Sequence, residues 1–364
     1  MARSLTIHDI AKQAGVSATV VSRVINGREG KIPISAAMRE RVLEIVRQTG
    51  YRPSAAARAL ALGQTHTLLM VVESKSAAGG YDYGAAFRAG MVAAQRLRYK
   101  AYALFTGEDV DLAQYPVLRE TTVDGIVVMG AVRAETLREF ADRGIPLVYV
   151  NGLHEQPHDC VLADDRQGAQ AAVEHLLGLG HQEIALIASD SPHPSVAKRL
   201  SGYRRAHEEA GMPFRATHVF PTPEAFLSAM ALRPRPPFSA AFCYTDYEML
   251  VVLSGLAQHG LRIPDDISLV SCNDSGVAKD ILPALTSVAV PFEEMAVAGV
   301  EMLVERIRTG GPLPSRTLPE QLIVRASTRA LSGTDGRRRG RQDRDGVPAV
   351  AQVAGWMARE AATA

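Results

Sequence analysis

A first group of residues that could do chemistry lies close to the amino terminus, where small and polar side chains are interleaved with valine. Ser17, Ala18 and Thr19 would form the first turn of a short helix, followed by Ser22 and Arg23. The first turn of such a helix fits the major groove of DNA. There Ala18 and Thr19 would face base edges, and Arg23 would pair with O6 and N7 of a guanine. The alternative for Arg23 is a solvated surface arginine.

Hydroxyl and amide groups around the same helix suit phosphate oxygens, which position a protein on DNA without reading its sequence. Ser17, Ser22 and Asn26 carry such groups, and Thr6 carries one at the start of the preceding segment. The predicted DNA-contacting residues of this region are therefore Thr6, Ser17, Ala18, Thr19, Ser22, Arg23 and Asn26.

A second group of polar residues follows short apolar runs in the rest of the chain. Its members stand at or just beyond the ends of the runs at 68–72, 146–150, 240–244 and 268–272, and they are Ser74, Asn151, Thr245, Asp246, Asn273 and Asp274. The runs have the character of buried strands, and open parallel sheets bind ligands beyond the carboxyl ends of their strands. We therefore expect a site for a small polar molecule there. The alternative for each of these residues is a helix cap.

The elements that position the first group are three short helices. Thr6 caps a helix whose third position is Asp9, a capping-box variant, and Gly15 ends it. Ser17 caps a second helix that runs through Val21, Val24 and Ile25. Ser35 opens a third helix, which places Met38, Val42, Ile45 and Val46 on one face and stops at Gly50. Two helices joined by a tight turn, with a third to close the core, predict a helix-turn-helix.

The elements that position the second group alternate between strand and helix. Strands are predicted at 68–72, 101–105, 125–129, 146–150, 184–188, 240–244, 268–272 and 287–290. Helices are predicted at 84–97, 135–143, 166–179, 197–210, 246–259 and 292–308. This alternation predicts an α/β fold of parallel sheets covered by helices on both faces. About 265 residues are too many for one comfortable sheet, so we expect two similar lobes.

These elements divide the chain into four predicted segments: a helix-turn-helix domain at 1–52, a hinge helix and linker at 53–65, a body at 66–330 and a disordered tail at 331–364. One lobe of the body would combine 66–163 with 290–320, and the other would combine 164–289 with 321–330. The hinge helix is too short to be stable alone, so it should fold only with a partner.

The net charge of +1 conceals a strong partition along the chain. Residues 1–63 contain ten basic and four acidic residues, a net charge of +6, and residues 331–364 add +2. The segment between them therefore carries −7. A basic head on an acidic body indicates a nucleic-acid partner for the head.

Composition excludes several classes of protein. A hydrophobic content of 47% with 22% charged residues is ordinary for a globular protein. The three cysteines, Cys160, Cys243 and Cys272, are odd in number and lack CxxC spacing, which argues against a disulfide framework or a cysteine zinc site. No apolar run approaches the ~18 residues of a membrane helix, and no signal peptide precedes the first helix. We therefore expect a cytoplasmic protein without a membrane partner.

The order of these motifs resembles the lactose/galactose repressor (LacI/GalR) family. The segments that carry the resemblance are Thr6–Ser17, Val21–Asn26, Arg39–Val42, Gly50–Pro53, Ala57–Leu60, Val173–Leu176, Gly180–His181, Arg199–Tyr203, Ile263–Ser268 and Pro283–Thr286. They span residues 5–329. The resemblance implies a helix-turn-helix and a body like that of periplasmic binding proteins. It also implies a transcriptional regulator, most commonly a repressor, that binds a near-palindromic DNA operator as a homodimer and responds to a sugar or related effector.

The resemblance assigns further roles to individual residues. Leu60, with Ala57 beside it, would wedge between base steps in the minor groove; the alternative is that Leu60 packs on the body. Asn151, Arg199, Thr245 and Asn273 would contact the effector, and Asp164 would lie near the crossover between lobes. The tail lacks the leucine heptads of the lactose repressor, so a dimer is favoured over a tetramer.

Three features depart from the family pattern. Val20 stands where the family usually has threonine, and the loop 27–34 is about three residues longer than in the lactose repressor. Asn151 and Asn273 stand where the lactose repressor has aspartates. Because asparagine keeps the hydrogen bonds and removes the charge, a sugar acid or phosphorylated sugar becomes a hypothesis for the effector.

An enzyme and a solute-binding protein are the two alternatives to a transcriptional regulator. An enzyme is disfavoured because no GxGxxG after a strand, P-loop, GxSxG or HExxH motif is present, and no cofactor is expected. His154, His158 and Asp159 have some metal-ligand character but lie in a predicted loop. A solute-binding protein without DNA function would share the two-lobed body; the basic head and the missing signal peptide argue against it.

Overall fold

The computed structural model describes residues 5–25, 33–52, 63–73, 81–106, 123–132, 134–153, 155–231 and 237–331. The chain divides into two units, Met1–His66 and Thr67–Ala364. Several predicted features lie outside the described residues: Asn26, the hinge helix with Ala57 and Leu60, Ser74, His154 and almost all of the predicted tail.

The described residues of the first unit form three helices, α1 (Ile7–Ala14), α2 (Ala18–Ile25) and α3 (Ala36–Thr49). Thr6 and Asp9 form the predicted capping box, in which the Thr6 backbone N–H donates to Asp9 Oδ2 over 2.8 Å. Gly15 ends α1 with a φ of 69°, a left-handed conformation that suits glycine. Ser35 caps α3 as predicted. The capping residues therefore place the helix ends where the sequence analysis expected them.

A small apolar core holds these helices together. Its buried members are Ile10, Ala11, Ala14, Val21, Val24 and Val42. Each helix contributes to it, although each is short for an isolated helix in water. Packing against the other two helices thus supplies stability that local propensity alone would not.

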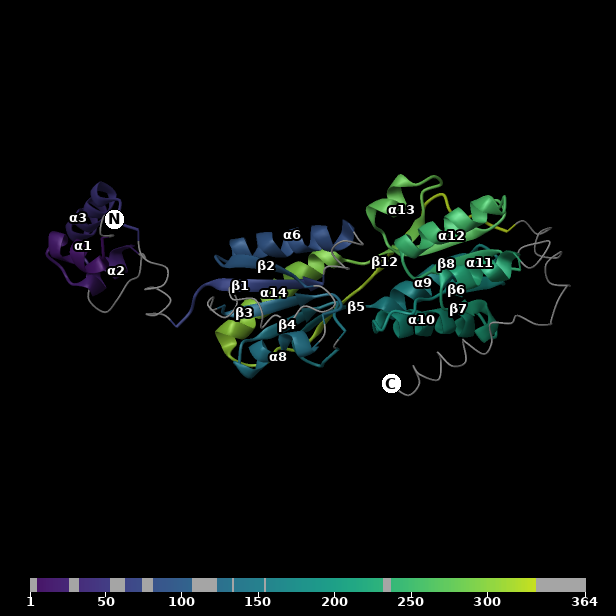
Figure 1. The fold of residues 1–364 in the computed structure, drawn as a ribbon, viewed down its shortest axis with the longest axis horizontal. Helices are drawn as coiled ribbons and strands as arrows, with labels where there is room; N and C mark the ends of the chain where they lie inside the picture. Colours follow the sequence, from purple (N-terminus) through teal and green to yellow (C-terminus); the bar gives the residue numbers. More distant parts are fainter. Residues whose placement is uncertain are drawn as a thin grey trace. The chain divides into compact units, whose positions relative to one another are not determined.

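The second unit is built on two six-stranded sheets (Figure 1). The first sheet has the order β11 (Arg316–Leu318), β5 (Cys160–Ala163), β4 (Leu147–Val150), β3 (Gly125–Met129), β1 (Thr67–Glu73), β2 (Lys100–Thr106), and all its pairs are parallel. The second has the order β12 (Gln321–Ile323), β10 (Thr286–Ala289), β9 (Ser268–Asn273), β8 (Ala240–Cys243), β6 (Ile184–Ile187), β7 (Val219–Phe220), parallel except for β12. The predicted α/β class with two sheets is confirmed.

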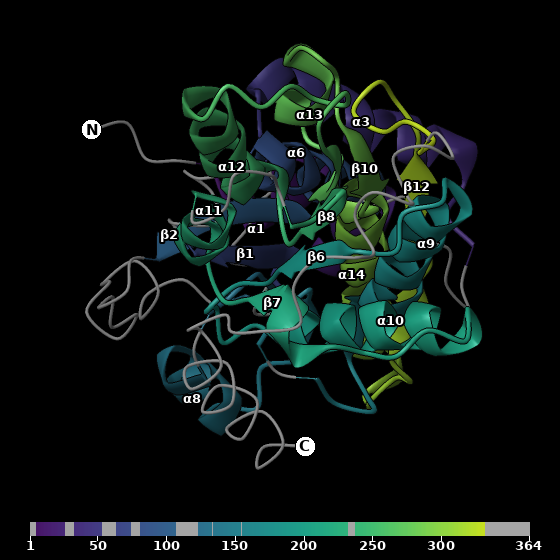
Figure 2. The same ribbon diagram turned by 90° about the vertical axis from the view of Figure 1, so that its right-hand side faces the viewer.

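Helices cover both faces of each sheet, which explains why central strands such as β3 and β8 are apolar and buried throughout. On the first sheet, α6 (Tyr81–Arg96) and α14 (Phe292–Thr309) cover one face and α8 (Ala134–Asp142) the other (Figure 1). On the second, α9 (Asp165–Gly178) and α10 (Ser195–Glu209) cover one face, and α11 (Pro223–Ala231) and α12 (Asp246–Gln258) the other (Figure 2). A 3₁₀ turn (Ala216–His218) and the short α13 (Gly276–Asp280) complete the second lobe.

Between the described strands and helices, the chain passes from one sheet to the other three times. The crossovers join β5 to α9, β10 to α14, and β11 to β12. We call the first sheet with its helices the first lobe and the second sheet with its helices the second lobe. Because parallel strands are entered from the same end, their carboxyl ends in each lobe lie together at one edge of the sheet.

Candidate functional site

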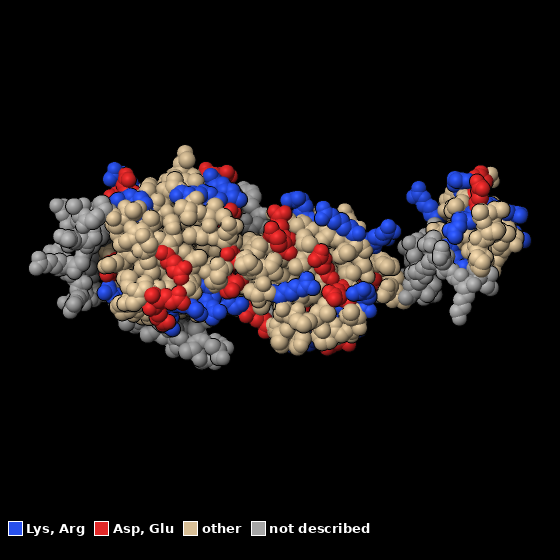
Figure 3. Space-filling model, turned by 180° about the vertical axis from the view of Figure 1, so that it is seen from behind, with Lys and Arg blue, Asp and Glu red and all other residues tan. Residues whose placement is uncertain are grey.

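The candidate DNA-contacting surface is the start of α2 and its surroundings. Ser17 and Thr19 are exposed and Ala18 is half-buried, so the first turn presents small side chains outward. Ser17 Oγ accepts a hydrogen bond from the backbone N–H of Val20 over 3.4 Å and thereby caps the helix. Ser22 and Arg23 lie half-buried one turn further on. On the visible face of this unit, Lys and Arg side chains are widely spread, whereas Asp and Glu gather at one place (Figure 3).

The candidate effector site lies at strand ends in both lobes, where the backbone is unusual. Asn151, after β4, has a φ of 48°, and Asn273 and Asp274, at the end of β9, have φ values of 103° and 53°. Non-glycine residues in this region are uncommon, and such strain is often found at binding sites. Three of the predicted effector residues are therefore held in conformations that their neighbours must enforce.

Asn151 links the two lobes. Its Nδ2 donates to the hydroxyl of Tyr83 on α6 over 3.2 Å. Its backbone oxygen lies 3.1 Å from Nε2 of His193, which stands in the second lobe between β6 and α10. His193 was not among the predicted site residues, and a histidine between two prolines offered little signal in the sequence.

Arg199, a predicted effector residue, is buried in contacts within the protein and is only 5% exposed. Its Nε donates to Asp165 Oδ1 over 3.1 Å, and its Nη1 donates to the backbone oxygen of Tyr244 over 2.5 Å. The guanidinium also lies 4.6 Å from the centre of the Tyr244 ring. This arrangement uses the charge of Arg199 to hold α10, the start of α9 and the end of β8 together.

A second carboxylate, Glu320, stands beside this ion pair on the crossover between β11 and β12. Its Oε1 is 3.9 Å from Nη2 of Arg199, and the residue is 4% exposed. A Cβ atom on Gly168 of α9 would lie 1.8 Å from Glu320 Oε2, so only glycine leaves room for this carboxyl. Burial raises the pKa of Glu320 to about 8, although the nearby Arg199 acts in the opposite direction. Glu320 and Asp165 were both missed by sequence reasoning.

The remaining predicted residues have structural contacts of their own. Asp164 caps α9 by accepting from the backbone N–H of Gln167 over 3.1 Å, and Thr245 caps α12 by accepting from that of Glu248 over 3.1 Å. Asp274 forms ion pairs with Arg325 at 2.5 Å and Lys279 at 3.4 Å.

Asp246 is fully buried, and three serines bond its carboxylate. It accepts from Ser271 Oγ, from the backbone N–H of Ser275 over 2.7 Å and from Ser287 Oγ over 2.8 Å. The contacts of Asp246 thus hold β9, β10 and the start of α13 around the strand ends.

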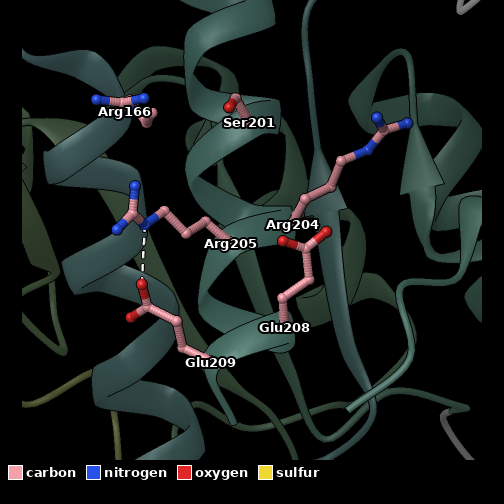
Figure 4. Close-up of a pocket in the computed structure, with 6 residues that line it drawn as sticks. All are labelled: Arg166, Ser201, Arg204, Arg205, Glu208 and Glu209. Carbon is pink, nitrogen blue, oxygen red and sulfur yellow. Dashed lines mark hydrogen bonds and ion pairs between the residues drawn. The ribbon is translucent and has the colours of Figure 1, made fainter. Parts of the chain in front are cut away.

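A surface pocket of about 480 Å³ lies elsewhere on the second lobe, on α9 and α10 (Figure 4). Its lining residues are Arg166, Ser201, Arg204, Arg205, Glu208 and Glu209. Arg205 donates to Glu209 over 2.8 Å, and Arg204 points away toward the ring of Phe214. None of these residues stands at a strand end, so this pocket is separate from the candidate effector site.

Metal-binding clusters and membrane-spanning helices are both absent from the described residues. Within them, no group of three or more His, Cys, Asp or Glu could hold a metal ion. No described helix is both long enough and apolar enough to cross a membrane.

A helix-turn-helix unit joined to a two-lobed body with polar strand ends defines the class of DNA-binding proteins controlled by a small ligand. Residues 6–54 match the model of bacterial regulatory proteins, lacI family, and residues 173–328 match that of a periplasmic binding protein-like domain. The HTH-type transcriptional regulator DegA of Bacillus subtilis (strain 168) is 31% identical over 346 residues, which cover 90% of this chain and 99% of DegA. The chain therefore belongs to the lacI family and is a ligand-controlled transcriptional regulator.

Two solved structures support the same architecture. The complex of the transcriptional regulator CelR with cellobiose has a TM-score of 0.65 and 29% identity, covering 89% of this chain and 99% of CelR. The Lac repressor dimer bound to operator and the anti-inducer ONPF has a TM-score of 0.72 over 90% of this chain and 100% of that one. At 23% identity, the second likeness concerns the fold alone.

Proposed function

We propose that this chain is a cytoplasmic, non-enzymatic transcriptional repressor that binds a near-palindromic operator as a homodimer and responds to a sugar-class effector. The observation that carries the proposal is the combination of a helix-turn-helix with strained polar strand ends in both lobes of one body. One short recognition helix reads few bases, so two copies are needed for a specific site.

For the effector we propose a neutral sugar bound by Asn151 and Asn273. Both side chains are half-buried, and both stand at strand ends with positive φ. The charge of Arg199 is engaged by Asp165, which weakens the case for a sugar acid. The cellobiose complex of CelR, a relative in fold and sequence, supports a sugar.

The other predicted effector residues receive supporting roles in this proposal. Arg199, Asp246 and Asp164 would position the strand ends, because their polar atoms already have partners inside the protein. Thr245 and Asp274 would shape the site from the ends of β8 and β9. Ser74 remains a predicted contact outside the described residues.

The effector proposal is tested by thermal unfolding of the full chain with cellobiose, ribose, galactose, glucuronate and glucose 6-phosphate. A neutral sugar should raise the melting temperature, and Asn273→Ala should abolish that rise. Gln258→Ala, on the exposed end of α12, is the control and should retain it. Stabilisation by the two anions only would contradict the neutral-sugar proposal.

The DNA proposal is tested by selecting bound fragments from random double-stranded DNA with the full chain. We expect enriched fragments to share a near-palindromic motif, and the effector found above should change their affinity. A chain lacking residues 1–63 should bind none of them. Enrichment of fragments without a common motif would contradict sequence-specific binding.

A further inference from the structure

The carboxyl group of Glu248 lies at two neighbouring strand ends of the second lobe. Strand β6 pairs with β8 so that Ile187 stands opposite Cys243. Ser189 and Thr245 each stand two residues further on, so their side chains lie at adjacent strand ends. Thr245 Oγ1 donates to Glu248 Oε2 over 3.4 Å. Burial raises the pKa of Glu248, and the nearby hydroxyls of Ser189 and Thr245 act in the opposite direction.

Capping of α12 does not explain the position of this carboxyl. Thr245 and Glu248 have the spacing of a capping box, in which the glutamate side chain also accepts from the backbone N–H of the threonine. The box formed by Thr6 and Asp9 at α1 has both halves. Helix α12 has only the threonine half, in which Thr245 Oγ1 accepts from the backbone N–H of Glu248 over 3.1 Å. The carboxyl of Glu248 is therefore available for another role.

The Glu248 carboxyl has more acceptor positions than its neighbours fill. A carboxylate offers about four such positions, and the two hydroxyls can occupy two of them. Ser189 Oγ also accepts from the backbone N–H of Ser191 over 3.3 Å. Within the part of the chain that the structure describes, no further hydrogen bond to this carboxyl and no ion pair with it is present. Acceptor positions therefore remain for the donors of a ligand.

The charges around Glu248 favour some ligands over others. Arg199 of α10 favours the charged carboxyl, and Asp190, which follows β6, opposes it. The charge of Arg199 is engaged by Asp165, whose Oδ1 lies 2.9 Å from Nη2. Asp190 is exposed. Negative charge is thus in excess at this strand end, an arrangement that accepts hydroxyl donors and repels anions.

We propose that Glu248 is a specificity-determining residue of the effector site, which accepts hydrogen bonds from hydroxyl groups of a neutral sugar and excludes sugar acids and sugar phosphates. Hydrogen bonds to a charged acceptor are stronger than those between neutral groups. The same charge repels an anionic ligand, so one carboxyl both attracts one class and rejects the other. The assignment rests on the proposed function, because it requires the effector to bind at these strand ends.

The test is isothermal titration calorimetry of the full chain with cellobiose, ribose, galactose and glucose, and with the anions glucuronate, galacturonate and glucose 6-phosphate. The measured quantities are the affinity for the tightest neutral sugar and its ratio to the affinity for the tightest anion. Glu248→Gln is the main variant, because glutamine has nearly the same shape and still offers an oxygen to Thr245. Glu224→Gln removes the same charge at an exposed position of α11 and is the control. Cooperative thermal unfolding checks that each variant is folded.

Wild type and Glu224→Gln should bind a neutral sugar more tightly than any of the anions. Glu248→Gln should weaken neutral-sugar binding by about 5- to 30-fold, because hydrogen bonds to a charged acceptor become bonds to a neutral one. The preference for the neutral sugar should fall by at least about fivefold, since the anions lose a repulsive neighbour. Glu248→Asp, which keeps the charge and shortens the side chain, should weaken neutral-sugar binding and still exclude the anions.

Wild-type affinity together with wild-type preference in Glu248→Gln would overturn this role of Glu248. The proposed function would then stand, because wild type would still bind a neutral sugar. An equal loss in Glu224→Gln would also overturn the role, since removal of any one negative charge would suffice. A wild type that binds only the anions, or none of these ligands, would overturn the neutral-sugar proposal itself and the role of Glu248 with it.

Discussion

At the scale of single residues, the most informative side chains are those whose polar atoms have few possible partners. Nε2 of His193 faces the backbone oxygen of Asn151, and Arg199 is held by Asp165 and the backbone oxygen of Tyr244. Neither can change its partners without leaving buried polar atoms unpaired, which costs about 1–3 kcal/mol per group. These residues therefore hold the elements around them in one arrangement.

If Arg23 makes the predicted bidentate contact to guanine, Arg23→Ala should weaken operator binding by about 1–3 kcal/mol, or roughly 5- to 150-fold. The loss should disappear when that guanine is replaced, as gel-shift titration at constant salt would show. Arg41→Ala, on the exposed side of α3, is the matched control and should have a smaller effect that is equal for all sequences. Equal losses on both DNAs for Arg23→Ala would assign Arg23 to phosphate contact.

Glu320→Gln should change how stability depends on pH. The pKa of Glu320 is raised from 4.5 to about 8, so between these values the folded chain binds a proton that the unfolded chain has lost. The free energy of unfolding contributed by this group therefore falls as pH rises through that range. The melting temperature of Glu320→Gln relative to that of wild type should therefore be higher at pH 8 than at pH 5, which thermal unfolding at the two pH values would measure. Glu224→Gln, at an exposed carboxylate on α11, is the control. Its melting temperature relative to wild type should be the same at both pH values.

At the scale of elements, helix packing depends on a few glycines that bring backbones close together. A Cβ atom on Gly202 of α10 would lie 2.2 Å from the backbone oxygen of Arg166 on α9. Since that atom cannot move without the whole helix, the glycine sets the separation of α9 and α10. Gly84 of α6 has no neighbour within 4 Å of such a Cβ atom.

Gly202→Ala should lower the free energy of unfolding by about 1–3 kcal/mol through overpacking. Gly84→Ala should leave it unchanged or raise it by up to about 1 kcal/mol, because alanine is the better helix former. Chemical denaturation of the full chain followed by circular dichroism measures both. Equal effects of the two substitutions would show that α9 and α10 can move apart at little cost.

The predicted hinge helix gives a second test at this scale. Leu60→Ser should abolish tight operator binding if Leu60 wedges between base steps, because a hydroxymethyl group cannot replace the apolar contact. The unfolding of the body should remain as in wild type. Unchanged affinity in a gel-shift titration would favour the alternative, that Leu60 packs on the body.

At the scale of the whole molecule, the outer edge of the first sheet is exposed and apolar. Tyr102 on β2 is 53% exposed and Phe105 is 50% exposed. Among the described strands β2 lies at the edge of its sheet, and apolar side chains on an edge strand favour association with another chain. We expect this edge to contribute to the homodimer.

Tyr102→Glu should therefore shift the chain toward monomer in sedimentation velocity and weaken operator binding in parallel. Val324→Glu, at an equally exposed position (57%) beyond β12, is the control and should leave the sedimentation coefficient unchanged. A dimer of undiminished stability in Tyr102→Glu would place the interface elsewhere.

Local patterns predicted most elements well. Residues that begin or end helices of the first unit cap them through local hydrogen bonds. The sequence therefore predicts the helix boundaries at Thr6, Gly15 and Ser35 correctly. The strand at Gly125–Met129 was predicted to the residue, because it is apolar throughout. The predictions omitted β5, β7, β11 and β12, which have two to four residues, as well as α11 and α13. Runs that short carry little periodicity, and tertiary pairing decides their structure.

The family, the helix-turn-helix and the alternation of strands and helices that builds two sheets are predictable without coordinates, because they depend on motifs and on local propensity. The polar residues that follow the apolar runs also predict an effector site at the strand ends, which remains a prediction. The contacts of Arg199 with Asp165, of Glu320 with Gly168 and of His193 with Asn151 arise only when the chain folds. Each of these contacts joins residues far apart in the chain, and burial, which sets their protonation and their partners, exists only once the lobes have folded.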